Sequence, residues 1–82
     1  MNIREVLARN LRTLRQAKGI SQEDLADRAS IDRTYISSLE RCVYNASIDV
    51  VDRLATALGV EAADLLKRPP SRRRAQKSPV LE

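Results

Sequence analysis

The stretch DRTYISSLER, Asp32–Arg41, decides how this chain of 82 residues is expected to fold. Asp32 is a residue type that caps helix N-termini, and only Ile36 and Leu39 after it are clearly apolar. At about 100° per residue, these two share one side of a helix with Tyr35. The opposite side is polar and carries Thr34, Ser37, Ser38 and Arg41, with Arg33 on its flank. The stretch therefore predicts a short helix with one apolar and one polar face.

The polar face of this predicted helix favours contact with another surface over simple exposure to water. A solvated helix face usually carries long Glu and Lys side chains in pairs four residues apart. Here, small hydroxyls and arginine donors would let the helix approach a partner closely, as in a DNA groove. A polar face that only meets water is the alternative that this stretch by itself leaves open.

Composition limits the chain to one small domain whose core is marginal, so a homodimer is expected before any motif is considered. One cysteine and no histidine exclude an internal disulfide and leave only scattered carboxylates for a metal, so we expect no cofactor. No apolar run approaches the roughly 18 residues of a membrane span. The N-terminus MNIREVLARN is too charged for a signal peptide. These features predict a cytoplasmic protein without a membrane partner.

The net charge of +4 is unevenly distributed along the chain. Residues 1–66 hold nine basic and ten acidic side chains, a net charge of 9 − 10 = −1. Residues 67–82 hold six basic side chains and a single acidic one, Glu82. The positive charge therefore belongs to the C-terminal segment, KRPPSRRRAQKSPVLE. Prolines, like charges and few apolar residues predict that residues 67–82 are a disordered basic tail, in which residues 81–82 are interpreted as vector-derived.

Helical periodicity recurs through residues 1–66 without the alternation expected of strands, which predicts an all-α domain of five helices. The capping residues are Asn2 with Glu5, Ser21 with Asp24, Asp32, and Ser47, and the helix ends lie near Gly19, Ser30, Arg41 and Gly59. A short fifth helix is expected over residues 62–66. The fourth helix has an apolar stripe that is predicted to face the core, made of Ile48, Val51, Leu54, Ala55 and Leu58.

The segment from Gln22 to Arg41 resembles the helix-turn-helix of the phage-repressor-like family, also called the Cro/C1 or XRE type. The resemblance rests on six positions in order and spacing: Leu25, Ala26, Ala29, Ile31, Ile36 and Leu39. It extends from about Arg9 to Leu66, including LRTLRQAKGISQEDLA before the motif and DRLATALGV after it. Within the family, DRTYISSLER is most similar to the recognition helix of controller proteins from restriction-modification operons. The resemblance implies a lambda-repressor-like fold and sequence-specific binding of double-stranded DNA.

Two positions depart from the family pattern, because Ser30 and Cys42 stand where glycine is common. If Ser30 adopts a positive φ, the cost is roughly 1 kcal/mol, which a packed domain tolerates. The path of the loop after Cys42 is left open. The thiol itself is interpreted as a small, partly buried side chain rather than a redox sensor, because the sequence around it carries no signal of a reactive cysteine.

The side chains expected to contact DNA bases lie on the predicted recognition helix. Arg33 has the planar fork that pairs with guanine, and its alternative role is a phosphate contact. Thr34 and Ser38 are predicted to point outward toward base edges, and Ser37 could reach either a base or the backbone. Tyr35 either packs at the edge of the apolar stripe or contacts DNA, as the resemblance implies.

A second set of residues is expected to contact the DNA backbone. The resemblance implies that Gln22, at the start of the second helix, binds the sugar-phosphate backbone. Arg41, Tyr44 and Asn45 could complete a phosphate clamp on the other side of the groove. Glu40 would repel phosphates, so it is expected to pair with an arginine of the first helix instead.

A two-fold dimer is predicted to form through the fourth and fifth helices. Val50 and Ala57 lie opposite the apolar stripe on the helical wheel, and Leu65 and Leu66 cannot both face inward. The predicted interface therefore consists of Val50, Ala57, Val60 and one of the two leucines Leu65 and Leu66, and the alternative is that Val50 is a lone surface valine and the dimer forms elsewhere. Such a dimer would place two recognition helices about 34 Å apart, on an inverted-repeat operator.

The sequence thus predicts a transcriptional regulator that binds DNA, with RNA polymerase as a further candidate partner and no small-molecule ligand. A DNA-binding antitoxin is the main alternative, although the tail lacks the apolar periodicity that would wrap a toxin. An adaptor without base specificity is a third. No enzyme activity is expected, because no serine or cysteine has an identifiable base and the chain lacks a Gly-rich phosphate loop.

Overall fold

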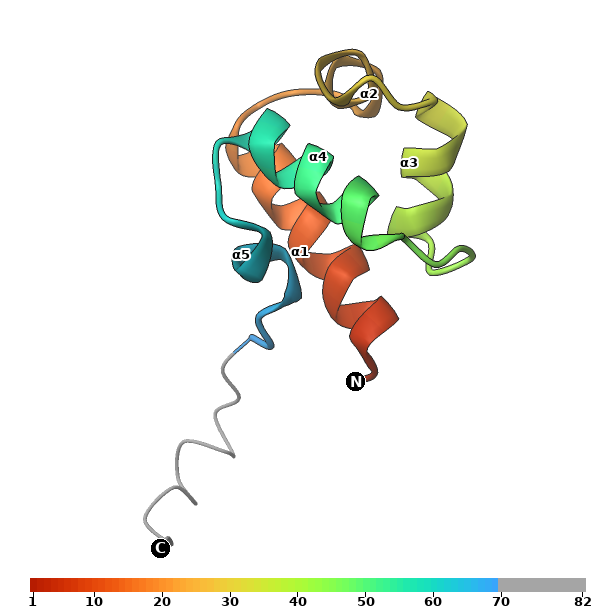
Figure 1. The fold of residues 1–82 in the computed structure, drawn as a ribbon, viewed down its shortest axis with the longest axis vertical. Coiled ribbons are helices and arrows are strands. Elements are labelled where there is room, and N and C mark those ends of the chain that lie inside the picture. Colours follow the sequence, from red (N-terminus) through yellow and green to blue (C-terminus); the bar gives the residue numbers. More distant parts are fainter. Residues whose placement is uncertain (70–82) are drawn as a thin grey trace, which may run out of the picture.

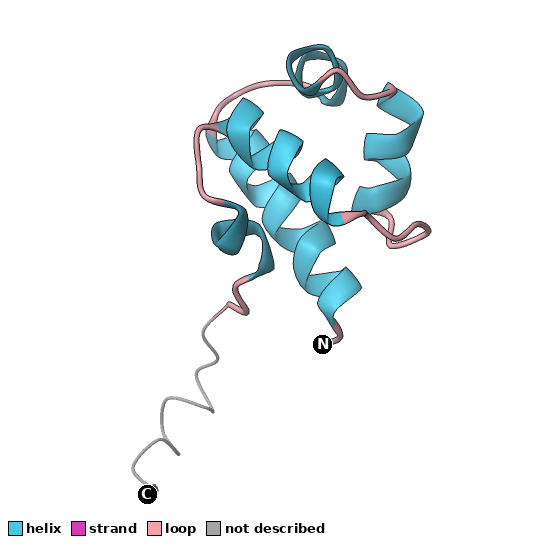
Figure 2. Cartoon of the chain, viewed as in Figure 1, coloured by secondary structure: helices cyan, strands magenta, loops and turns pink. Residues whose placement is uncertain are grey.

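The computed structural model describes residues 1–69, which form five helices and no strand (Figure 2). In chain order the helices are α1 (Ile3–Ala17), α2 (Gln22–Ala29), α3 (Arg33–Glu40), α4 (Ile48–Leu58) and α5 (Ala62–Leu66). The predicted all-α fold is confirmed, and the helices begin and end within about two residues of their expected bounds.

The predicted capping residues explain why each of the first four helices begins where it does. The Asn2 side chain accepts the backbone N–H of Glu5, and Glu5 Oε1 accepts the backbone N–H of Asn2, both at 2.9 Å. Ser21, Asp32 and Ser47 likewise accept a backbone N–H in the first turn of α2, α3 and α4. Each cap satisfies a donor that the helix itself leaves without a partner.

Four residues that follow helices adopt the left-handed conformation: Gly19 (φ 72°), Ser30 (φ 59°), Cys42 (φ 61°) and Gly59 (φ 73°). The next residue then donates its N–H back to the helix, as Val43 does to the Ser38 carbonyl at 2.9 Å. This conformation costs a residue with a Cβ about 1–2 kcal/mol. The expected positive φ at Ser30 is confirmed, and Cys42 carries the same strain.

The core draws on all five helices. Seven leucine and isoleucine side chains of the core are at most 2% exposed: Leu11, Leu25, Ile36, Leu39, Leu54, Leu58 and Leu65. Removing such a side chain from water stabilises the fold by about 1.5–3 kcal/mol. Helix α1 packs against α3 and α5, α2 packs against α3 and α4, and α4 packs against α5. The result places α3 along one outer edge of the domain and α5 on the opposite side (Figure 1).

The sequence predictions about the burial of Ile48 and Cys42 are wrong. Ile48 was assigned to the core stripe of α4 but is 87% exposed. It is the first residue of α4, and helical side chains lean toward the N-terminus, so Ile48 projects beyond the end of the packed region. Cys42, expected to be partly buried, is exposed in the loop after α3, where its Sγ lies 3.7 Å from the Arg4 carbonyl oxygen.

The chain keeps ordered contacts slightly beyond α5. Asn10 Nδ2 in α1 donates to the carbonyls of Leu65 at 2.9 Å and Lys67 at 2.8 Å, and Arg68 donates to the Met1 carbonyl. These contacts reach past Leu66, where the domain was expected to end. The predicted disorder of the tail from residue 70, and the interpretation of residues 81–82, lie outside the described residues. Within residues 1–69, no helix has both the length and the apolar character needed to cross a membrane.

Candidate nucleic-acid interface

Helices α2 and α3 form a compact unit joined by the turn at Ser30. Leu25, Ala26 and Ala29 of α2 are buried, and the small alanine side chains allow α2 and α3 to pack closely. The N–H of Ile31 donates to the Ala26 carbonyl at 2.9 Å, which fixes the chain as it leaves α2. The packing of α2 against α3 and the hydrogen-bonded turn between them therefore fix the direction of α3 relative to the core.

The side chains that the sequence assigned to base recognition differ in exposure along α3. Arg33 and Thr34 are exposed, whereas Ser37 and Tyr35 are half-buried. Ser38 is only 8% exposed, so the prediction that it points outward is wrong. The loop after α3 folds back onto the last turn, where Val43 donates to the Ser38 carbonyl. Helical periodicity contains no information about such a loop.

Tyr35 connects α3 to the loop that precedes α4. Its hydroxyl donates to the Asn45 carbonyl at 3.1 Å, and its ring meets the Tyr44 ring edge to face, with centroids 5.5 Å apart. Such aromatic pairs stabilise by about 0.5–1.5 kcal/mol beyond burial. Tyr44, Asn45 and Arg41 are all exposed on this loop. The structure therefore brings the three loop residues of the expected phosphate clamp beside α3, and it gives Tyr35 a packing role.

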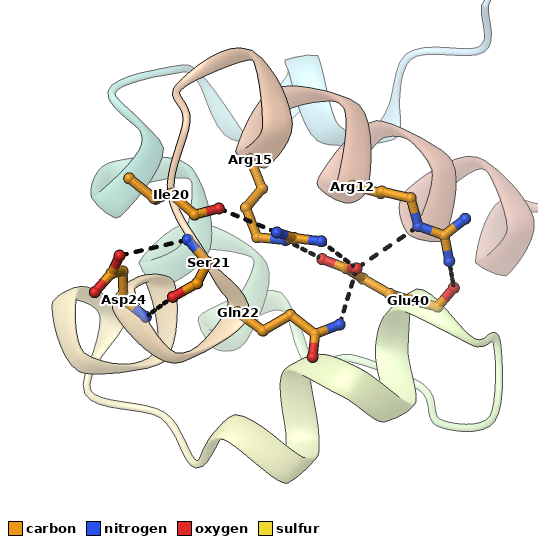
Figure 3. A network of polar contacts seen from close by, with 7 residues as sticks. All are labelled: Arg12, Arg15, Ile20, Ser21, Gln22, Asp24 and Glu40. Carbon is orange, nitrogen blue, oxygen red and sulfur yellow. Dashed lines mark hydrogen bonds and ion pairs between the residues drawn. The ribbon is translucent and has the colours of Figure 1, made fainter.

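The other end of α3 is anchored by a buried carboxylate. Glu40 is 4% exposed, and its carboxylate accepts Arg15 Nε at 2.7 Å and Arg15 Nη2 at 3.0 Å (Figure 3). Arg12 Nε lies 3.7 Å from the same carboxylate, and Arg12 Nη2 donates to the Glu40 carbonyl at 3.0 Å. The expected pairing of Glu40 with an arginine of the first helix is confirmed, and two arginines take part.

The surroundings of Glu40 keep it ionised. Burial by itself raises the pKa of the Glu40 carboxyl, because the charged form loses water. The hydrogen bonds from Arg15 and Gln22, together with the charges of Arg15 and Arg12, outweigh burial and hold the pKa of Glu40 below its ordinary value. A negative charge at Glu40 is thus compensated inside the protein.

Gln22 at the start of α2 is half-buried and belongs to the same network. Its Nε2 donates to Glu40 Oε1 at 3.1 Å, and Arg15 Nη1 donates to the Ile20 carbonyl at 3.0 Å, two residues earlier in the chain (Figure 3). The link between Gln22 and Glu40 was not foreseen from the sequence. The spacing of 18 residues between them has no helical meaning, so only tertiary structure brings them together.

An apolar groove lies between the start of α1, the loop after α3, the start of α4 and α5. Its volume is about 610 Å³, and its lining includes the exposed side chains Ile3, Tyr44, Ile48 and Leu66 together with the charged residues Arg4, Asp49 and Asp52. The groove contains most of the large apolar side chains that residues 1–69 leave exposed.

This groove differs from the predicted dimer surface. Of Leu65 and Leu66, one of which was expected at that surface, Leu65 is 0% exposed in the chain's own core and does not belong to the surface, whereas Leu66 is exposed. Val50, Ala57 and Val60 are half-buried and pack against the same core, which leaves little of them for a second copy to cover. Only Leu66 of the predicted set lines the groove.

Among the described residues, no group of His, Cys, Asp or Glu side chains is arranged to hold a metal ion.

Comparison with known proteins agrees with this geometry. A helix-turn-helix family model matches residues 11–65. Control protein C.SmaI from Serratia marcescens is 41% identical over 68 residues, covering 83% of this chain and 81% of the relative.

Solved structures show the same likeness. The crystal structure of the hypothetical transcription factor NHTF from Neisseria has a TM-score of 0.79 and 43% identity, covering 92% of this chain and 84% of that one. The restriction-modification controller protein C.Esp1396I, crystallised as a tetramer with its natural 35 base-pair operator, has a TM-score of 0.73 and 31% identity, covering 79% and 86%. This chain therefore belongs to the helix-turn-helix family of DNA-binding transcriptional regulators.

Proposed function

We propose that this protein binds an inverted-repeat operator as a homodimer and controls transcription in the manner of restriction-modification controller proteins. One observation carries the proposal: α3 is anchored on its inner side by the core and Glu40, while Arg33 and Thr34 in its first turn remain exposed. The likeness to a controller protein solved on its operator supports this reading.

Base recognition is assigned to the exposed first turn of α3. The Arg33 guanidinium can donate two parallel hydrogen bonds to guanine O6 and N7. Thr34 can offer its hydroxyl to a base edge or its methyl to a thymine methyl. Ser37 is half-buried and serves at the edge of this surface. The Tyr35 hydroxyl already donates its hydrogen to the Asn45 carbonyl. While that bond is kept, the hydroxyl can only accept a hydrogen bond from DNA.

Contacts with the DNA backbone are assigned to both flanks of α3. Gln22 lies on one flank at the start of α2, and Arg41, Tyr44 and Asn45 lie on the other in the loop after α3. Backbone contacts fix the orientation of a protein on the duplex without reading sequence. The assignment of Ser38 to DNA is withdrawn because the side chain is buried.

The dimer is proposed to form through the apolar groove and not through the surface expected from the sequence. A two-fold interface must be self-complementary. The groove meets this requirement, because apolar Ile48 and Leu66 are accompanied by Arg4 on one wall and by Asp49 and Asp52 on another. Among residues 1–69 the only ion pairs join Glu40 to Arg12 and Arg15. Arg4 of one copy can therefore pair with an aspartate of the second.

Other functional assignments follow the family. A cytoplasmic location and a purely binding function without enzyme activity are part of this proposal. The antitoxin alternative gains no support from the comparisons, which include controller proteins and repressors.

Selection of bound duplexes from a random library tests the proposal directly. The full chain should enrich two inverted half-sites whose centres are about one helical turn, 34 Å, apart. A chain with Arg33→Ala, selected in parallel, should lose the preference at one base pair of each half-site. Enrichment of a single half-site would contradict the dimer, and no enrichment at all would contradict sequence-specific binding.

A further inference from the structure

The side-chain amide of Gln22 is held in one orientation by Glu40. An ionised carboxylate only accepts hydrogen bonds, so Gln22 can bind it only through Nε2 and not through its carbonyl oxygen. The observed bond from Nε2 to Glu40 Oε1 is 3.1 Å. One of the two Nε2 hydrogens is thereby used, and the second hydrogen has a direction fixed by the first.

The carboxylate that holds Gln22 is itself fixed from several sides. Arg15 donates two hydrogen bonds to Glu40, and the side chain of Arg15 is only 13% exposed (Figure 3). The same arginine donates to the Ile20 carbonyl just before α2, so it ties the approach to Gln22 as well. Arg12 adds a further charge at 3.7 Å and a hydrogen bond to the Glu40 carbonyl. The position of Glu40 therefore depends on α1, which is not expected to touch DNA.

We propose that Glu40 is a positioning residue for DNA backbone binding, which turns the second N–H of Gln22 toward a phosphate. This inference rests on the proposed function, in which Gln22 contacts the DNA backbone. Without Glu40, the amide of Gln22 can rotate by half a turn and present its carbonyl oxygen, which a phosphate repels. A phosphate, like a carboxylate, can only accept hydrogen bonds. The two Nε2 hydrogens of Gln22 can therefore bind one group each, the first Glu40 and the second the phosphate.

A double-mutant cycle separates this role from a purely structural one. Gln22→Met keeps the length of the side chain but removes its hydrogen bonds, and Glu40→Gln keeps the shape but removes the charge. The affinities of wild type, both single variants and the double variant are measured on the selected duplex and on a scrambled one. Circular dichroism fixes a temperature at which all four chains are folded.

The expected result is strong non-additivity. Each single substitution should weaken binding to both duplexes about tenfold, the scale of one hydrogen bond to a charged group. Glu40→Gln should then cost nothing further in the chain that carries Gln22→Met. The sign of the effect of Glu40→Gln is itself informative. Removing a negative charge would by simple electrostatics strengthen binding to DNA, whereas the loss of amide positioning weakens it. The matched control is a chain that carries Arg33→Ala in place of Gln22→Met. In that chain, Glu40→Gln should weaken binding as strongly as it does in the wild type.

Three outcomes would overturn the inference in distinguishable ways. If Glu40→Gln weakened binding equally with and without Gln22→Met, its role would be structural and the proposed function would stand. If Glu40→Gln left affinity unchanged, the amide would need no positioning. If Gln22→Met itself had no effect, the backbone contact would leave the proposed function and the inference would fall with it.

A measurement on the unsubstituted chain keeps the test independent of the folding of the Glu40 variant. In the free protein, the Nε2 proton of Gln22 that is bound to the carboxylate should resonate away from its position in a solvated glutamine, because the hydrogen bond deshields it. Addition of the selected duplex should shift chiefly the other proton. Two protons at the shifts of a solvated glutamine would show that Glu40 does not orient the amide.

Discussion

The two ends of α3 have similar polar sequences but opposite environments. At the first turn, Arg33 and Thr34 are exposed, whereas in the last turn Ser38 and Glu40 are buried. At the last turn, Arg12 and Arg15 of α1 donate to Glu40, and Val43 of the following loop donates to the Ser38 carbonyl. Polar side chains of this helix are therefore accessible at one end and buried at the other, where Glu40 anchors the helix to α1. The difference predicts separate effects on stability and on DNA binding.

The largest expected effect is on stability at the buried end. Glu40→Ala should lower the free energy of unfolding by about 3–5 kcal/mol, because it leaves Arg15 without its carboxylate in a mostly buried site. Urea unfolding measures this loss. Arg33→Ala, at the other end of the same helix, is the matched control and should change stability by no more than about 0.5 kcal/mol. Equal losses would remove the contrast between the two ends.

The second effect concerns the other exposed surface, the apolar groove. Ile48→Glu should dissociate the dimer, because an unpaired charge would be buried against the second copy. Sedimentation should then show a monomer at concentrations where wild type is a dimer. Val43→Glu is a suitable control, since Val43 is a 61% exposed aliphatic side chain that does not line the groove. A dimer that survived Ile48→Glu would place the interface elsewhere.

The third effect is the loss of base discrimination at the exposed end. Arg33→Ala should reduce the preference for the specific duplex over a scrambled one by about 1–3 kcal/mol while weak, salt-sensitive binding remains. Competition binding at fixed salt measures the ratio of the two affinities. If the ratio stayed at the wild-type value, Arg33 would be a phosphate contact instead.

The fourth effect is a pH dependence of stability that Glu40 contributes at the buried end of α3. The pKa of Glu40 is lowered by folding, so the unfolded chain binds more protons and the contribution of Glu40 to stability is present above its unfolded pKa, about 4.3. That contribution is lost as the pH falls below this value toward the folded pKa. Unfolding measured between about pH 6 and pH 3 should show a shallower acid loss for Glu40→Gln than for wild type. Parallel curves would show that Glu40 is not ionised in the folded protein.

The smallest effect is expected where α3 ends. Cys42 has φ 61° and is exposed, so Cys42→Gly should relieve left-handed strain at little packing cost. We expect a gain of up to about 1 kcal/mol in the free energy of unfolding, and the same sign for Ser30→Gly at the end of α2. Thermal unfolding measures both. A loss at Cys42 would mean that its contact with the Arg4 carbonyl outweighs the strain.

Local rules predicted the helices well because each rule acts over a few residues. The cap at Asp32, the box of Asn2 with Glu5 and the left-handed turn at Ser30 depend on neighbours within one helical turn. The pairing of Glu40 with α1 was also foreseen, from the argument that a carboxylate would otherwise face phosphates. The roles of Arg33, Thr34 and Gln22 on DNA stay predictions.

The misplaced residues share a different cause, which is that a helical wheel treats every turn of a helix alike. Ile48 lies on the same stripe as Leu54, but it begins α4 and projects past the packed region, so it is exposed. Ser38 lies on the polar side, but the loop after α3 returns across the last turn. Leu65 is buried between α1 and α4, which both contact α5. The burial of these three residues therefore depends on where each helix ends relative to the neighbouring helices and loops.

The five helices and the exposed polar first turn of the third follow from residues that are close in the sequence, because capping and periodicity are local and the helix-turn-helix pattern spans neighbouring elements. Tertiary structure alone decided which polar residues of that helix are accessible, and it created both the groove around Ile48 and the link from Glu40 to Gln22. The physical reason is that burial and hydrogen bonding between distant segments depend on how helices and loops meet in space, which no short stretch encodes.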